Sequence, residues 1–154
     1  TTPDTCYPPM TEQPLIAEVS QKALIRSPAD ELLVMQADAE TWELPGGRMG
    51  AAEAPIAGLK REVHEETGLS VSVGEPIHTA AWRNDVGRGR FSVVYFCETE
   101  ATTVELSDEH CAFEWVSPST ARDEFLTVSI HQTAIDRLLA ADSSPVGQPA
   151  ASND

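Results

Sequence analysis

The chain has 154 residues, of which 41% are hydrophobic, and its formal net charge at pH 7 is −15. Its length fits one domain with an apolar core, and no stretch approaches the roughly 18 consecutive apolar residues of a membrane-spanning helix, so we expect a cytoplasmic protein without a membrane partner. The negative charge argues against nucleic acid as a partner because it would repel phosphate groups.

The N-terminal part is predicted to form a loose arm followed by a β-hairpin. Residues 1–14 are rich in Pro and Thr, whereas residues 15–27 and 31–36 are runs of strand-forming residues separated by a turn-favouring Ser-Pro-Ala-Asp cluster. In residues 42–47, the Pro-Gly-Gly segment is expected to leave regular structure because glycine adopts backbone angles that are closed to other residues.

Two helices and further strands are predicted after this loop. A helix over residues 54–67 is indicated by Pro55 in its first turn, by Gly68 just past its end, and by the apolar spacing of Ile56, Leu59 and Val63. Strands are expected at residues 69–73, 77–82, 91–98 and 112–116, with a loop at 84–90. An apolar stripe predicts a second helix over residues 129–141, and residues 142–154 are expected to be disordered. Strands around two helices predict an α/β fold in which a mixed sheet lies between the helices.

Three carboxylates lie close together on the first predicted helix. Glu62, Glu65 and Glu66 are spaced i, i+3 and i+4, which places them at neighbouring positions on one face. Clustered oxygen ligands suit Mg²⁺ or Mn²⁺, whose charge would relieve the mutual repulsion of these groups, and the Gly-Gly segment upstream offers a backbone carbonyl as a further ligand. A solvated acidic helix face is the alternative that spacing alone leaves open.

A wider pattern surrounds these glutamates. Residues 47–69 read G-x5-E-x7-R-E-V-x-E-E-x-G-L, with defined positions at Gly47, Glu53, Arg61, Glu62, Val63, Glu65, Glu66, Gly68 and Leu69. This string resembles the Nudix box at every defined position, and a pattern of this length at fixed spacing is far more specific than a short glycine motif. The resemblance implies a Nudix hydrolase domain over residues 15–141 with a Nudix-like α/β/α sandwich fold.

The resemblance also implies roles for individual residues. Glu62, Glu65 and Glu66 would be ligands of Mg²⁺ or Mn²⁺, joined by the Gly46 carbonyl, and Glu53 would support the metal or its water. Arg61 would orient the glutamates through ion pairs. The implied reaction is the attack of water on a phosphorus of a nucleoside diphosphate linked to another moiety.

The residue that takes the proton from water is less closely defined. The family uses either a glutamate of the box or an acid from a later loop, and this sequence offers Glu62 or one of Glu105, Asp108 and Glu109. We favour Glu109, although a polar turn before a strand explains this residue equally well. Arg83, Arg88 and Arg90 are expected as a group to bind the substrate phosphates in a chain that has few positive charges, although ordinary surface arginines are the alternative for each.

Other readings stay open beside the hydrolase. A nucleotide-binding sensor domain without activity is one, although such domains commonly have damaged boxes, and an RNA-processing relative is another that the charge disfavours. No substrate-specific signature is identified outside the box, and we expect a small nucleotide substrate and a monomer or homodimer. The acidic, lysine-poor composition resembles that of proteins from halophiles, and the three cysteines, Cys6, Cys97 and Cys111, are expected to be reduced thiols.

Overall fold

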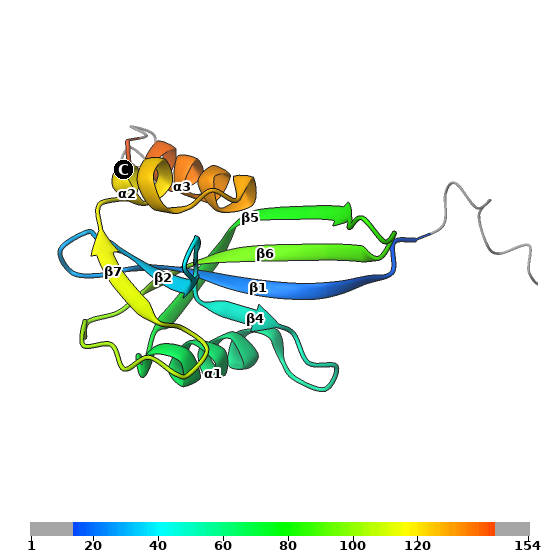
Figure 1. Cartoon of the computed structure of the whole chain (residues 1–154), viewed down its shortest axis with the longest axis horizontal. Coiled ribbons are helices and arrows are strands. Elements are labelled where there is room, and N and C mark those ends of the chain that lie inside the picture. The colour runs from blue at the N-terminus through cyan, green and yellow to red at the C-terminus, as the bar shows by residue number, and fades with distance from the viewer. Residues whose placement is uncertain (1–13, 144–154) are drawn as a thin grey trace, which may run out of the picture.

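The computed structural model describes residues 14–143 and shows a sheet held between helices (Figure 1). The strands are β1 Ala17–Arg26, β2 Leu32–Asp38, β3 Thr41–Glu43, β4 Gly46–Arg48, β5 Ser72–Arg83, β6 Gly89–Glu98 and β7 Ala112–Val116. The helices are α1 Pro55–Thr67, the short α2 Pro118–Thr120, the π-helical turn Ala121–Phe125 and α3 Ser129–Asp142. The expected N-terminal arm and C-terminal tail lie outside the described residues, apart from Pro14, Asp142 and Ser143.

All strands belong to one mixed sheet. Its main order is β3-β2-β1-β6-β5, with β4 paired to β1 and β7 paired to β2. The central pair, β1 and β6, is parallel from Ala17↔Gly89 to Arg26↔Glu98, whereas the other pairs are antiparallel. The predicted mixed sheet is therefore confirmed.

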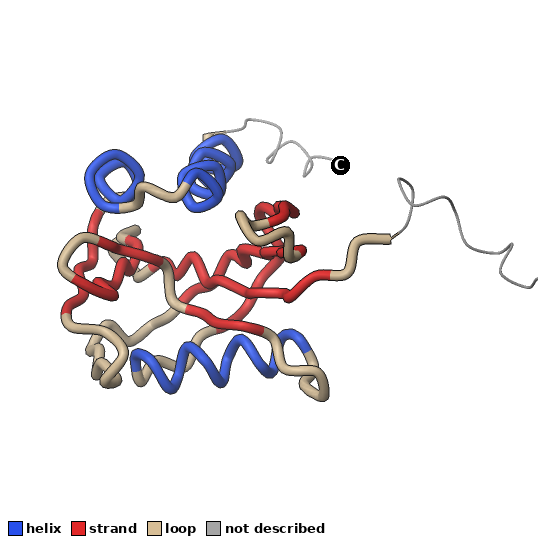
Figure 2. The backbone as a smooth tube through the Cα atoms, turned by 45° about the vertical axis from the view of Figure 1, so that its right-hand side comes forward, coloured by secondary structure: helices blue, strands red, loops and turns tan. Residues whose placement is uncertain are grey.

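Helices cover both faces of the sheet (Figure 2). On one face, Leu59 and Val63 of α1 pack against a cluster that includes Ile25 of β1. On the other face, Ile135 and Leu138 of α3 pack against a second cluster from β1, β2 and β6. This arrangement confirms the predicted α/β/α sandwich. No helix within residues 14–143 is long and apolar enough to span a bilayer.

The first helix follows its sequence signals closely. Pro55 occupies its first turn, and Gly68 ends it in the left-handed conformation with φ 76°, where its N–H donates to the His64 carbonyl at 2.8 Å. The spacing of Ile56, Leu59 and Val63 predicted this helix correctly, but only Leu59 and Val63 are fully buried, whereas Ile56 is 40% exposed. The buried stripe continues instead to Glu66, which is one helical turn beyond Val63.

Three details of the strands differ from the sequence-based expectations. The expected β1–β2 hairpin pairs only at Arg26↔Leu32, and β4 lies beside residues 20–22 of β1 instead. The glycines predicted to leave regular structure are part of β4. Residues 69–73 and 77–82 do not form two strands, because a single strand, β5, runs from Ser72 to Arg83 with an irregular register around Pro76. The edge position of β5 tolerates this proline, which has no N–H for the ladder.

Candidate active site

The two glycines of β4 face the polar side of α1. Gly46 has φ 141°, and a Cβ there would lie 2.0 Å from the carbonyl oxygen of Gln21, so only glycine allows β4 to lie this close to β1. The Gly46 N–H donates a hydrogen bond of 3.0 Å to Glu66 Oε1. Glu66 is only 6% exposed, and its burial raises the pKa of the carboxyl group, although the Gly46 N–H opposes this shift.

Glu62 lies against the next residue of the same strand. A Cβ on Gly47 would meet the carboxylate carbon and one oxygen of Glu62 at 2.8 Å. Glu62 and Glu66 are one helical turn apart on the same face of α1. Gly47 of β4 therefore lies against Glu62, and Gly46 lies against Glu66. The negative charge of Glu62 contributes to the raised pKa of the Glu66 carboxyl.

Arg61 gathers the remaining carboxylates of the motif. Its Nη1 donates to Glu65 Oε1 at 3.0 Å, its Nη2 donates to Glu53 Oε1 at 3.0 Å, and the same nitrogen lies 3.3 Å from Glu62 Oε2. The hydrogen bonds from Arg61 lower the pKa of the Glu53 carboxyl, and its hydrogen bonds to Glu53 and Glu65 raise the pKa of the guanidinium. One arginine therefore contacts the three acidic side chains that lie beside it.

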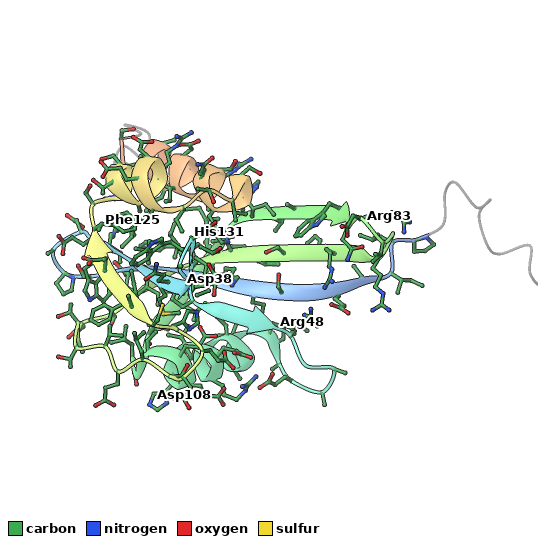
Figure 3. The ribbon with its side chains drawn as sticks, viewed as in Figure 1. Asp38, Arg48, Arg83, Asp108, Phe125 and His131 are labelled. Carbon is green, nitrogen blue, oxygen red and sulfur yellow. The ribbon has the colours of Figure 1, made fainter. Side chains whose placement is uncertain are left out.

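The segment between β6 and β7 packs against the end of α1. The Glu105 N–H donates to the Thr67 carbonyl at 2.8 Å, and the Ser107 N–H donates to the Glu66 carbonyl at 3.3 Å. The three acids proposed from the sequence in this segment, Glu105, Asp108 and Glu109, are all exposed. Figure 3 shows Asp108 beside α1. This segment therefore brings further carboxylates to the end of the helix that carries Glu66.

The proposed substrate arginines lie around the β5–β6 hairpin. Arg83 is at the end of β5, as Figure 3 shows, and donates to the Gly87 carbonyl at 3.3 Å, whereas Arg88 is exposed in the turn. Arg90 forms an ion pair with Glu18 of β1, which is also 3.4 Å from Arg48 of β4. Sequence reasoning missed Arg48, and its position directly after the Gly-Gly pair was the available signal.

A partly buried polar cluster lies beside this arrangement. Lys22, Glu43 and His110 are linked by short contacts, with Lys22 Nζ 3.6 Å from Glu43 Oε1 and His110 Nε2 2.8 Å from Glu43 Oε2. His131 of α3 is 6% exposed, and burial together with the charge of Lys22 lowers the pKa of its imidazole to about 4. Figure 3 places His131 between α3 and the sheet. No periodic pattern or motif in the sequence indicates this cluster.

The thiols and two of the tryptophans differ widely in their exposure. Cys97 is fully buried, and burial raises the pKa of its thiol to about 12, which excludes a reactive thiolate there. Cys111 is exposed, and both thiols are free. Trp42 packs edge-on against Phe125 with ring centroids 4.9 Å apart. Trp82 is 41% exposed.

The donor chemistry of this region fits a divalent cation. Glu62 and Glu66 offer hard oxygen ligands beside the same short strand, and a cation next to the buried Glu66 would favour its ionised form. Within residues 14–143, no three His, Cys, Asp or Glu side chains converge closely enough to hold one ion as they stand, and Glu65 is bonded to Arg61. The choice of residues, rather than a preformed cage, is therefore what points to a metal.

Comparison with known proteins gives consistent results. A family model described as NUDIX domain matches residues 18–138. A MutT-like protein from Streptomyces ambofaciens is 33% identical over 118 residues, which cover 77% of this chain and 75% of that protein. The crystal structure of a MutT protein from Methanosarcina mazei has a TM-score of 0.73 and 26% identity, covering 84% of this chain and 98% of the other.

A second solved structure supports the fold alone. The solution structure of the E. coli ORF135 protein has a TM-score of 0.73 and 24% identity, covering 88% of this chain and 96% of the other. At this level of identity, the likeness concerns the arrangement of helices and strands, and chemistry must be argued from the side chains.

Proposed function

Because the chain belongs to the Nudix hydrolase family and acts on phosphoric anhydrides, we propose that it hydrolyses a nucleoside diphosphate linked to another moiety in a reaction that depends on Mg²⁺ or Mn²⁺. The observation that carries this proposal is the placement of Glu62 and Glu66 against the consecutive glycines of β4. The substrate is a small nucleotide, and neither a nucleic acid nor a membrane takes part. The protein acts in the cytoplasm as a monomer or homodimer.

The proposed metal ligands are Glu62, Glu65 and Glu66, with the Gly46 carbonyl as a further oxygen donor. A bound divalent cation supplies charge neutralisation on the diphosphate and lowers the pKa of a coordinated water. Arg61 orients Glu65 and Glu62 through the contacts described above, and Glu53 holds the guanidinium from the other side. The chain's own contribution is a set of oxygen donors on one helix, next to a β4 backbone whose glycines leave room for them.

Glu109 is the proposed general base. Its carboxylate would accept the proton of the attacking water, and its exposure in a turn next to the end of α1 supports this role. Glu105 and Asp108 occupy the same segment and are the alternatives, together with Glu62 within the motif. Phosphate oxygens of the substrate would be bound by Arg83, Arg88 and Arg90 as a group. Arg48 joins this group because Glu18 holds it beside Arg90.

A substrate screen tests the proposal directly. Nucleoside triphosphates, ADP-ribose, NADH, nucleotide sugars and dinucleoside polyphosphates would be incubated with the wild type and Mg²⁺ or Mn²⁺, in low and high KCl. Glu66→Gln should lose turnover, and Glu109→Gln should lower kcat by about 10²–10⁴-fold. Glu75→Gln, at an exposed position of β5, is the matched control and should keep full activity.

The outcomes separate the parts of the proposal. Metal-dependent turnover that Glu66→Gln abolishes would support the activity and name the substrate class. Full kcat in Glu109→Gln, with loss in Glu66→Gln, would refute Glu109 as the base and move the assignment to Glu105, Asp108 or Glu62. Nucleotide binding without turnover under every condition would refute the hydrolytic proposal in favour of a sensor. Reaction in isotopically labelled water would show which phosphorus is attacked.

A further inference from the structure

A partly buried hydrogen bond joins the turn before β7 to the end of β3. His110 Nε2 lies 2.8 Å from Glu43 Oε2, and the His110 side chain is only 4% exposed. Burial acts to raise the pKa of the Glu43 carboxyl, but the charge of Lys22 and the hydrogen bond from His110 outweigh it and hold this pKa below its ordinary value. Because an ionised carboxylate only accepts, the His110 Nε2 carries the proton and donates.

Lys22 completes the contacts of Glu43. Its Nζ is 3.6 Å from Glu43 Oε1 and donates to the Leu44 carbonyl at 3.2 Å. Both oxygens of the Glu43 carboxylate thus have a partner, and one partner also holds the backbone that leads into β4. A partly buried carboxylate with a partner on each oxygen is held in position more firmly than an exposed one without partners.

Both Glu43 and His110 are connected to Glu66 through short stretches of backbone and further hydrogen bonds. On one side, Glu43 comes three residues before Gly46, whose N–H binds the Glu66 carboxylate. On the other side, the His110 N–H donates to the Ser107 carbonyl at 3.3 Å, and the Ser107 N–H donates to the Glu66 carbonyl at 3.3 Å. Glu109 lies within this turn, directly before His110. The His110–Glu43 bond therefore closes a ring of contacts around the end of α1.

We propose that His110 and Glu43 are positioning residues of the hydrolytic site. Their hydrogen bond holds the turn of residues 107–110, and with it Glu109, at a fixed separation from the Gly46 peptide that binds Glu66. Neither residue needs to touch the substrate for this role. The inference rests on the proposed function because it assigns both residues to the same site. Displacement of a reacting group by about 1 Å can cost about 100-fold in rate, so a tether of this kind has a measurable effect.

The test compares variants that remove the hydrogen bond with one that keeps it. His110→Leu removes the donor, and His110→Gln places an amide nitrogen near the position of Nε2. His110→Asn, whose shorter amide does not reach Glu43, is a second variant without the bond for the case that leucine prevents folding. His78→Leu, on β5 away from the cluster, is the matched control and should keep the wild-type kcat. Folding is followed by circular dichroism, and affinity for Mn²⁺ alone is followed by electron paramagnetic resonance of the free ion.

We expect His110→Leu to lower kcat by about 10–100-fold, the range typical of residues that orient a metal site, while KM and the Kd for Mn²⁺ change by less than about threefold. His110→Gln should restore kcat to within about threefold of the wild type. Adding Glu43→Leu to His110→Leu should lower kcat no further, because both changes remove the same hydrogen bond. The selective loss of kcat and its recovery in glutamine distinguish positioning from a merely structural contact.

Three results would overturn the inference. One is a folded His110→Leu or His110→Asn variant with kcat within twofold of the wild type. Another is a folded His110→Gln variant as slow as His110→Leu. The third is a loss that lies entirely in KM. A failure of the proposed function can be told apart from these results, because Glu109→Gln alone tests the assignment of the general base. Full kcat in Glu109→Gln together with a low kcat in His110→Leu would refute Glu109 as the base, and it would still support the role of His110 and Glu43 in positioning the Gly46 peptide.

Discussion

The two glycines of β4 allow stability and activity to be separated by single methyl groups. At Gly47, an added Cβ would lie 2.8–2.9 Å from the three carboxyl atoms of Glu62. These atoms are the end of a flexible side chain, which can turn away, so Gly47→Ala should reduce the free energy of unfolding by no more than about 1 kcal/mol. Because the displaced group is a proposed metal ligand, kcat should fall by about 10–100-fold.

At Gly46, the same methyl group has no such escape. Its Cβ would lie 2.0 Å from the Gln21 carbonyl and 2.9 Å from the Lys22 Cα, and both belong to the backbone of β1. The φ of 141° adds strain for any residue with a side chain. Gly46→Ala should therefore cost about 3 kcal/mol or more, which corresponds to a fall in Tm of roughly 6–12 °C for a chain of this size.

The assay pairs thermal and urea unfolding with steady-state kinetics on the substrate that the screen identifies. Manganese affinity is measured on the same samples. A Gly47→Ala protein with kcat and Mn²⁺ affinity within twofold of the wild type would refute the role assigned to Glu62. A Gly47→Ala protein as unstable as Gly46→Ala would refute the claim that the Glu62 side chain can move aside.

Three further predictions concern stability. The pKa of His131 is lowered from 6.5 to about 4, so the unfolded chain binds the proton more readily than the folded protein does. The contribution of His131 to stability is therefore full above about pH 6.5, and the free energy of unfolding falls by about 3 kcal/mol as the pH drops toward 4. In urea titrations His131→Gln should remove most of this pH dependence, whereas His64→Gln, at an exposed position, should not. Arg26 contacts Asp142 at 3.0 Å and lies over the Phe96 ring, so Arg26→Ala should cost about 1–2 kcal/mol, with Arg26→Lys less affected; equal stability of Arg26→Ala and the wild type would contradict this. The net charge of −15 should make Tm rise from low salt to molar KCl as repulsion is screened, and an unchanged Tm would argue against a halophilic adaptation.

The bounds of α1 depend on residues close together in the sequence, and for this reason short-range signals predicted them. The observed range Pro55–Thr67 differs from the predicted range 54–67 by only one residue. The agreement is close because Pro55 and Gly68 each determine a helix end within a single turn. The glutamate spacing follows from helical geometry alone, whereas the burial of each carboxylate does not. Glu66 is buried and Glu65 is exposed, although they are adjacent in sequence, since only one of them faces β4.

The strands show where local signals fail. Gly46 and Gly47 read as a loop because glycine weakens isolated strands, but β1 supplies partners that the sequence near them does not reveal. The sequence around Pro76 has a low strand propensity, so β5 was predicted as two separate segments. Pairing with β6 nevertheless maintains one strand through this irregular region.

By itself, the sequence determined the fold class, the extent of α1, the family motif and the set of carboxylates, because each of these depends on residue types at short, fixed spacing. Only the tertiary structure decided which carboxylates are buried, that Arg48 joins Arg90 at Glu18, and that His110 bonds to Glu43. His110 and Glu43 are 67 positions apart in the sequence, and no periodic pattern links them. Contacts of this kind arise from the packing of distant segments, which sets distances that spacing along the chain does not contain.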